Sequence, residues 1–96
     1  MGSGQLKTFR VSGSSMNPLL RDGDQISVVP ESEYKVGDIV VAVHPIQSDL
    51  TIIKRIEQIA PDSRLRLRGT NPDESTDNFG LVDQSRIIGK MTAKLD

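Results

Sequence analysis

Apolar and polar residues alternate in short runs along the chain, and glycine, proline, aspartate or serine bounds most of these runs. The clearest run is residues 64–68, where arginine and leucine alternate strictly, a pattern typical of a strand with one buried face. The runs predict six strands, at residues 6–11, 25–29, 39–44, 51–59, 64–68 and 87–95. We also expect one helical turn over residues 17–21 and a polar loop over residues 69–80. Many short strands at close spacing predict a mainly β fold, a small antiparallel, barrel-like sheet domain.

A chain of 96 residues has the length of one domain, so residues 1–96 are expected to form a single soluble domain. Residues 1–5 are expected to be disordered or to derive from cloning. No apolar run has the length of a membrane span, and no signal-peptide core is found near the N-terminus, so we expect no membrane anchor in this chain. The chain has no cysteine, which excludes disulfides and thiolate catalysis and favours a cytoplasmic location.

The charge of the chain narrows the classes of function. The formal net charge is −1, whereas a dedicated nucleic-acid binder usually carries a surplus of basic residues, so no nucleic-acid partner is expected. One feature points the other way, because Arg64, Arg66 and Arg68 share one face of a predicted strand. This stripe could dock an acidic protein or a nucleic acid, and the alternative is a solvated face.

The first candidate for chemistry is the turn Gly13-Ser14-Ser15 after the first predicted strand. A glycine-serine turn exposes hydroxyls and backbone N–H groups, and nucleophilic catalysis needs both an accessible Oγ and donors for the developing oxyanion. The alternative is an ordinary turn, because glycine and serine are common turn residues.

The second candidate is Lys54 in the predicted strand 51–59. Side chains alternate between the faces of a strand, so Lys54 shares one face with Ile52 and Ile56. An apolar face disfavours the charged ammonium, and a lysine acts as a general base only as the neutral amine. The alternative is a lysine that extends its head into solvent.

The third candidate is the loop from Gly69 to Asn78, which is rich in hydroxyl and carboxylate side chains. Such a loop could orient a lysine through Ser75 and hold its own shape through Asp77. Its composition equally fits a solvated surface loop.

Five sequence blocks stand in the order typical of one protease family. They are Ser-Met-x-Pro-x-Leu at 15–20, Gly-Asp-x-Ile at 23–26, Gly-Asp-Ile-Val-Val at 37–41, Ile-Lys-Arg at 53–55 and Gly-x-Asn-x-x-x-Ser-x-Asp at 69–77. In these blocks the chain resembles the signal-peptidase-I-like (S26) serine proteases. The resemblance covers nearly the whole chain, from about Val11 to Met91, and implies a β-rich fold of the signal-peptidase and repressor-protease type.

The resemblance also implies a Ser–Lys dyad. It carries over Ser15 as nucleophile and Lys54 as general base, with Ser75 orienting the lysine and Asp77 bracing the loop. The backbone N–H of Ser15 would serve the oxyanion hole. Gly13 stands where some members have a second serine for this purpose, so Ser12 and Ser14 are the nearby hydroxyl candidates.

The family's chemistry implies a peptide bound between residues 9–12 and 50–53 by strand addition. Candidates for a small S1 pocket are Val11, Met16, Leu20, Ile52 and Ile53. The alternative for each of them is packing in the core. No metal site and no cofactor are expected.

Within the family, the Gly-x-Asn-Pro-x-x-Ser-Thr-Asp pattern at residues 69–77 is similar to that of the maturation proteases of nickel-type superoxide dismutase. The implied partner is a precursor of that dismutase, from which an N-terminal propeptide is removed. Two alternatives stay open: a repressor-type, self-cleaving Ser–Lys protease domain, or a non-catalytic β-barrel module that binds protein or nucleic acid. A Ser-His-Asp hydrolase would need His44, the only histidine, which lies outside the matching blocks.

Overall fold

The computed structural model describes residues 6–31, 33–71 and 80–95. Seven strands within these residues form a single sheet, in which every neighbouring pair is antiparallel. The order across the sheet is β1-β2-β7-β3-β4-β5-β6. The strands are β1 (Lys7–Arg10), β2 (Gln25–Val29), β3 (Ile39–Val43), β4 (Thr51–Ile59), β5 (Leu65–Arg68), β6 (Leu81–Val82) and β7 (Ile87–Leu95). A short 3-10 helix, η1 (Gln84–Arg86), precedes β7.

The mainly β, antiparallel architecture is the one predicted from the sequence. Three predicted strands, 25–29, 51–59 and 87–95, have the expected bounds, and the other three are one or two residues shorter than expected. The sequence pattern missed β6 and η1, because a two-residue strand is too short to show a period. The predicted loop 69–80 lies largely outside the described residues.

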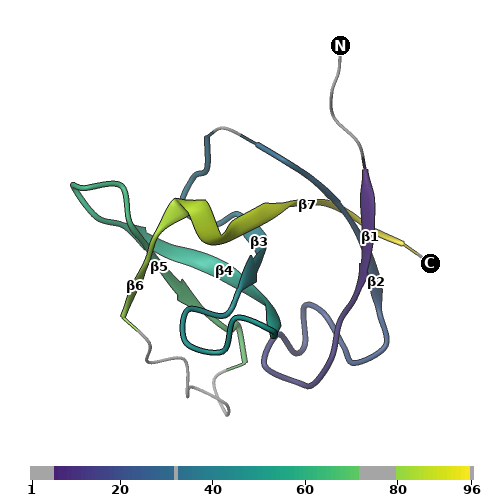
Figure 1. The fold of residues 1–96 in the computed structure, drawn as a ribbon. Helices are drawn as coiled ribbons and strands as arrows, with labels where there is room; N and C mark the ends of the chain where they lie inside the picture. The colour runs from purple at the N-terminus through teal and green to yellow at the C-terminus, as the bar shows by residue number, and fades with distance from the viewer. Residues whose placement is uncertain (1–5, 32, 72–79, 96) are drawn as a thin grey trace.

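The last strand joins the two halves of the sheet. Figure 1 shows β7 running from the side of β6 to the side of β1 and β2. It pairs with β3 through its first half and with β2 through its second half. At this crossing a Cβ on Gly89 would lie 2.6 Å from Val28 Cγ1 and 2.8 Å from the carbonyl oxygen of Val29, so the close approach requires glycine.

The core has two apolar clusters, and β3 contributes to both because both of its faces are buried. Ile39 and Val41 belong to the first cluster, and Val40 and Ala42 belong to the second. The first cluster also contains Val11, Met16 and Leu20, from the loop between β1 and β2. That loop is therefore anchored in the core.

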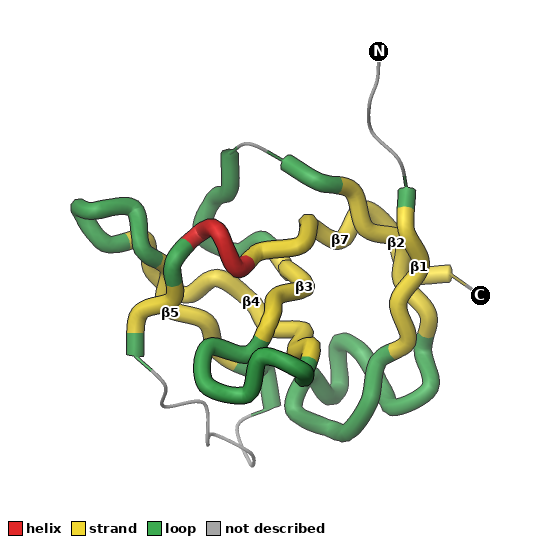
Figure 2. Tube along the Cα trace, viewed as in Figure 1, coloured by secondary structure: helices red, strands yellow, loops and turns green. Residues whose placement is uncertain are grey.

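The loops between β1 and β2 and between β3 and β4 lie at the same side of the molecule (Figure 2). Residues of both segments line one groove. No helix in the described ranges is both long and apolar enough to cross a bilayer.

Candidate functional site

Ser15 lies in the loop between β1 and β2, whose two ends are tied together. The Val11 N–H donates to the Asp24 carbonyl at 2.8 Å, and the Gly23 N–H donates to the Val11 carbonyl at 2.8 Å. Gly13 has a φ of +83°, a left-handed conformation that favours glycine, and its N–H donates to the Asp22 carboxylate at 2.8 Å. These bonds give the chain before Ser15 a fixed path.

The segment after Ser15 forms a hydrogen-bonded turn that contains a cis Asn17–Pro18 peptide, and the helical turn expected over residues 17–21 is not formed. The Leu20 N–H donates to the Met16 carbonyl at 2.8 Å, and the Met16 and Leu20 side chains are both 1% exposed. Burial of these two side chains fixes the backbone immediately after Ser15.

Lys54 lies in the middle of β4, with its backbone opposite that of Val40 in β3. The residue is only 7% exposed, and the alternation predicted from the sequence holds around it. Ile56 is buried in the second cluster and Ile52 packs against that cluster, while Arg55 and Glu57 are exposed. Lys54 is therefore held on the inner face of the strand.

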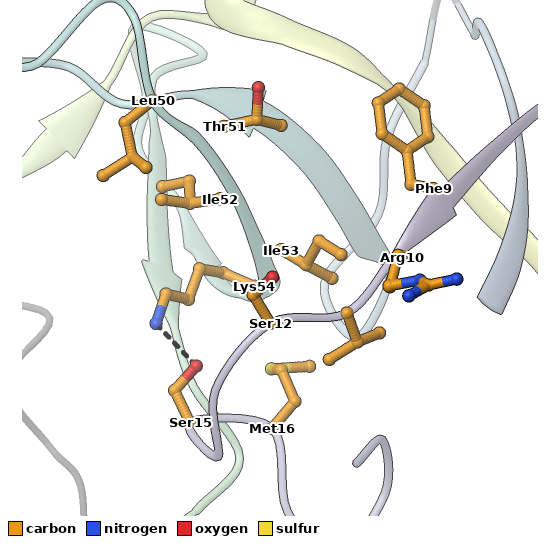
Figure 3. Close-up of a pocket in the computed structure, with 11 residues that line it drawn as sticks. Phe9, Arg10, Ser12, Ser15, Met16, Leu50, Thr51, Ile52, Ile53 and Lys54 are labelled. Atoms are coloured by element: carbon orange, nitrogen blue, oxygen red, sulfur yellow. Dashed lines mark hydrogen bonds between the residues drawn. The ribbon is translucent and has the colours of Figure 1, made fainter. Parts of the chain in front are cut away.

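The two residues meet across 39 positions of sequence. Lys54 Nζ lies 3.0 Å from Ser15 Oγ, in hydrogen-bonding geometry (Figure 3). This distance is within the range in which a general base takes a proton from a nucleophile. The arrangement is chemically competent for base-assisted attack by a serine.

Ser15 and Lys54 both line a groove of about 390 Å³. Figure 3 shows its walls, with residues of β1 and the following loop facing the first residues of β4. Four of the five residues expected to line a pocket do line it: Val11, Met16, Ile52 and Ile53. The fifth, Leu20, does not line the groove, because its side chain is packed in the first core cluster. Ser12 is part of the lining and Ser14 is not.

Both walls of the groove have a free strand edge. Of the described strands, only β2 pairs with β1. On the other wall, β5 pairs with β4 only from Arg55 onward, so the segment from Thr51 to Ile53 has one strand neighbour in the described part of the chain. Unpaired strand edges offer the backbone groups to which an extended peptide can bind.

Sequence reasoning missed two residues that contact the serine loop. The Asn71 N–H donates to the Ser15 carbonyl at 2.9 Å, and Asn71 Nδ2 donates to the Ser14 carbonyl at 2.8 Å. Thr70 Oγ1 donates to the Met16 carbonyl at 2.8 Å. Both residues lie inside the Gly-x-Asn block, so the signal was present, but the pattern does not say which groups they contact.

Two predicted positions, Ser75 and Asp77, lie outside the described residues. In the part that is described, no group of three or more histidine, cysteine, aspartate or glutamate side chains could hold a metal ion.

His44 has a structural role at the end of β3. Its Nδ1 accepts hydrogen bonds from the N–H groups of Ile46 and Gln47, at 3.1 and 3.0 Å. It does not line the groove beside Ser15. The geometry therefore does not favour a Ser-His-Asp arrangement.

The arginine stripe, with Arg66 and Arg68 on β5 and Arg64 just before it, is exposed, as its alternation with buried Leu65 and Leu67 predicts. Two of its members have acidic partners: Arg64 Nε lies 2.8 Å from Asp62, and Arg68 Nη1 lies 3.2 Å from Glu57. These ion pairs reduce the charge that the stripe offers to a polyanion.

Comparison with known protein families agrees with the Ser15–Lys54 geometry. A model of the family described as peptidase S24-like matches residues 1–92. The chain belongs to the peptidase S24-like family. This is a family of Ser–Lys peptidases and repressors related to S26, so the expected likeness is confirmed at the level of these related families. The match does not extend to the finer resemblance to maturation proteases of nickel-type superoxide dismutase. A comparison with curated proteins gave no significant match.

Membership of the S24-like family indicates a serine peptidase, a hydrolase with a protein substrate. The family also includes members that cleave themselves and members without catalysis.

Proposed function

We propose that this S24-like protein is a Ser–Lys endopeptidase in which Ser15 is the nucleophile and Lys54 the general base. The observation that supports it best is the 3.0 Å contact between Lys54 Nζ and Ser15 Oγ at the groove. With a buried lysine at this distance, the serine hydroxyl has a base without a histidine. The hydrogen bonds of His44 to the N–H groups of its own turn support a structural role for it.

In the proposed mechanism the neutral amine of Lys54 takes the proton of Ser15 Oγ, and Oγ attacks the scissile carbonyl carbon. The tetrahedral oxyanion is stabilised by the Ser15 N–H. When the intermediate collapses, the ammonium of Lys54 gives its proton to the leaving amine, and an acyl-enzyme remains on Oγ. Lys54 then takes a proton from water, the hydroxide attacks the ester carbonyl, and Oγ leaves with the proton returned by Lys54.

The substrate binds as an extended strand in the groove between β1 and β4. This arrangement is supported by the free edges on both walls and by the apolar lining from Val11, Met16, Ile52 and Ile53. Backbone hydrogen bonds would hold any extended peptide, and the apolar side chains would select the residues near the cut.

For the substrate we propose a protein precursor with an N-terminal propeptide, with the precursor of nickel-type superoxide dismutase as the specific candidate. The support is the pattern at residues 69–77, which is similar to that of the corresponding maturation proteases. The proposed place of action is the cytoplasm. The competing proposal is self-cleavage, which the S24-like family includes.

The test is incubation with the purified dismutase precursor, followed by intact-mass spectrometry of both proteins. We expect one clipped precursor, and no clipping by Ser15→Ala or Lys54→Met. Matched controls are Ser48→Ala and Lys35→Met, which change an exposed serine and an exposed lysine away from the groove and should leave the rate unchanged. Clipping that persists in both Ser15→Ala and Lys54→Met would contradict the dyad. Loss of mass from the protease itself, with an intact precursor, would favour self-cleavage.

A further inference from the structure

The two peptide planes on either side of Ser15 are both held by one residue. The carbonyl of Ser14 accepts from Asn71 Nδ2 at 2.8 Å, and the carbonyl of Ser15 accepts from the Asn71 N–H at 2.9 Å. In an extended strand consecutive carbonyls point in opposite directions, so this shared partner is possible only because the chain turns at Ser15. Asn71 therefore holds the nucleophile's backbone on both sides, and it shares the Ser14 carbonyl with the Asn17 N–H, which donates to it at 3.0 Å.

The orientation of these carbonyls also sets the direction of two N–H groups. A trans peptide is planar, so its N–H points away from its C=O. With both carbonyls directed at Asn71, the N–H groups of Ser15 and Met16 point to the opposite side. Neither N–H donates a hydrogen bond to any described residue. Ser15 and Met16 line the groove, whereas Asn71 does not.

We propose that Asn71 is a positioning residue that aims the N–H groups of Ser15 and Met16 at the oxyanion formed during peptide cleavage. The proposal rests on the proposed function of Ser15 as nucleophile. Donors that are fixed before the reaction stabilise the transition state without the cost of reorientation, and a small misplacement is expensive in rate. Asn71 touches no reacting atom and acts through the backbone that it holds.

Thr70 provides an internal comparison. Its hydroxyl donates to the Met16 carbonyl at 2.8 Å, from the same loop and to the next peptide plane. That plane carries the N–H of Asn17, which already donates to the Ser14 carbonyl at 3.0 Å. Loss of the Thr70 bond should weaken the attachment of the loop without releasing either N–H beside the nucleophile.

The experiment compares Asn71→Asp with Thr70→Val in the full chain. Asn71→Asp keeps the shape of the side chain and the backbone N–H, but replaces the donor to Ser14 with an acceptor. We expect kcat for a cleaved peptide to fall about 10- to 100-fold in Asn71→Asp with KM within about twofold, because the lost contribution is made only in the transition state. Thr70→Val should lose a similar amount of thermal stability with a much smaller change in kcat.

Amide NMR tests the positioning independently of proteolysis. The Ser15 amide resonance should move in Asn71→Asp and stay in place in Thr70→Val. An unmoved Ser15 amide in Asn71→Asp, or equal losses of kcat in the two variants, would overturn the proposal. If the wild-type protein cleaves no peptide, the proposed function fails, and the NMR comparison still decides whether Asn71 orients this backbone.

Discussion

Val40 and Lys54 stand directly opposite each other in the antiparallel pair of β3 and β4, and the Val40 side chain is fully buried. A lysine in a loop would lose conformational entropy to reach a serine hydroxyl in one geometry. Here the backbone of Lys54 is fixed by pairing with β3, a strand that is buried on both faces. The position of Nζ at Ser15 is therefore a property of the core as much as of the site.

Truncation of the Val40 side chain should lower the stability of the protein. Val40→Ala removes two methyl groups from the second cluster, and we expect the free energy of unfolding to fall by about 2 kcal/mol. Denaturant unfolding followed by circular dichroism measures the change. Val36→Ala is the matched control, because Val36 is 61% exposed and its truncation should cost less than about 0.5 kcal/mol. Equal losses in the two variants would contradict the role of Val40.

The sequence predicted most of the sheet because its strands are short, apolar and clearly bounded. The strict alternation at residues 64–68 and the buried run of β3 are both visible in the residue types. Order across the sheet was not predictable, because the insertion of β7 between β2 and β3 depends on contacts far apart in sequence.

The site could be predicted only in part, because residue patterns show the local features of a strand but not its distant contacts. The alternation around Lys54 indicates an inward-facing lysine, but nothing local indicates that it meets Ser15, 39 positions away. Only the order of the sequence blocks linked the two. Leu20 is a second example. An apolar residue near a nucleophile fits a pocket or a core equally well, and only the packing in the structure assigns Leu20 to the core.

Replacement of the only histidine separates the structural and catalytic interpretations of His44. His44→Ala removes the acceptor for the N–H groups of Ile46 and Gln47, so the turn before β4 should loosen. Because Leu50 closes that turn and lines the groove, KM should rise more than kcat falls. Steady-state kinetics on a peptide substrate measure both. A fall in kcat of about 10⁴-fold, with KM unchanged, would instead indicate a histidine base.

Asp24 should make the loop that carries Ser15 sensitive to acid. The N–H of Arg21 donates to the Asp24 carboxylate at 2.8 Å, and this bond, with help from Lys94, holds the pKa of Asp24 below its ordinary value. A carboxyl whose pKa is lower in the folded state contributes stability above its unfolded pKa of about 3.9, and loses it as pH falls through the folded pKa.

Asp24→Asn should therefore be less stable than the wild type at neutral pH, with a smaller loss on acidification. Thermal unfolding at a series of pH values measures this difference. Asp49→Asn is the control, because Asp49 is exposed in the turn between β3 and β4, outside the loop that carries Ser15. An Asp24→Asn protein that is as stable as the wild type at neutral pH and loses as much stability on acidification would exclude this contribution.

Arg10 should set a charge preference in the substrate. Among the residues that line the groove, the charged side chains are those of Arg10 and Lys54, and both are basic. Lys54 contacts Ser15, whereas Arg10 is exposed on the β1 wall and lies apart from the Ser15–Lys54 pair (Figure 3). An exposed ion pair contributes up to about 1 kcal/mol, so we expect acidic peptides to be favoured by up to about fivefold in kcat/KM.

A peptide series with a single aspartate or lysine moved along the sequence tests this preference. Side chains of an extended peptide alternate in direction, so the effect should appear at one position or at positions two residues apart. Arg10→Glu should reverse it, and added salt should weaken it. Lys7→Glu is the matched control, since Lys7 is an exposed cation on the same strand that does not line the groove. The same reversal in Lys7→Glu would assign the preference to the net charge of the protein, and no reversal in Arg10→Glu would remove Arg10 from substrate selection.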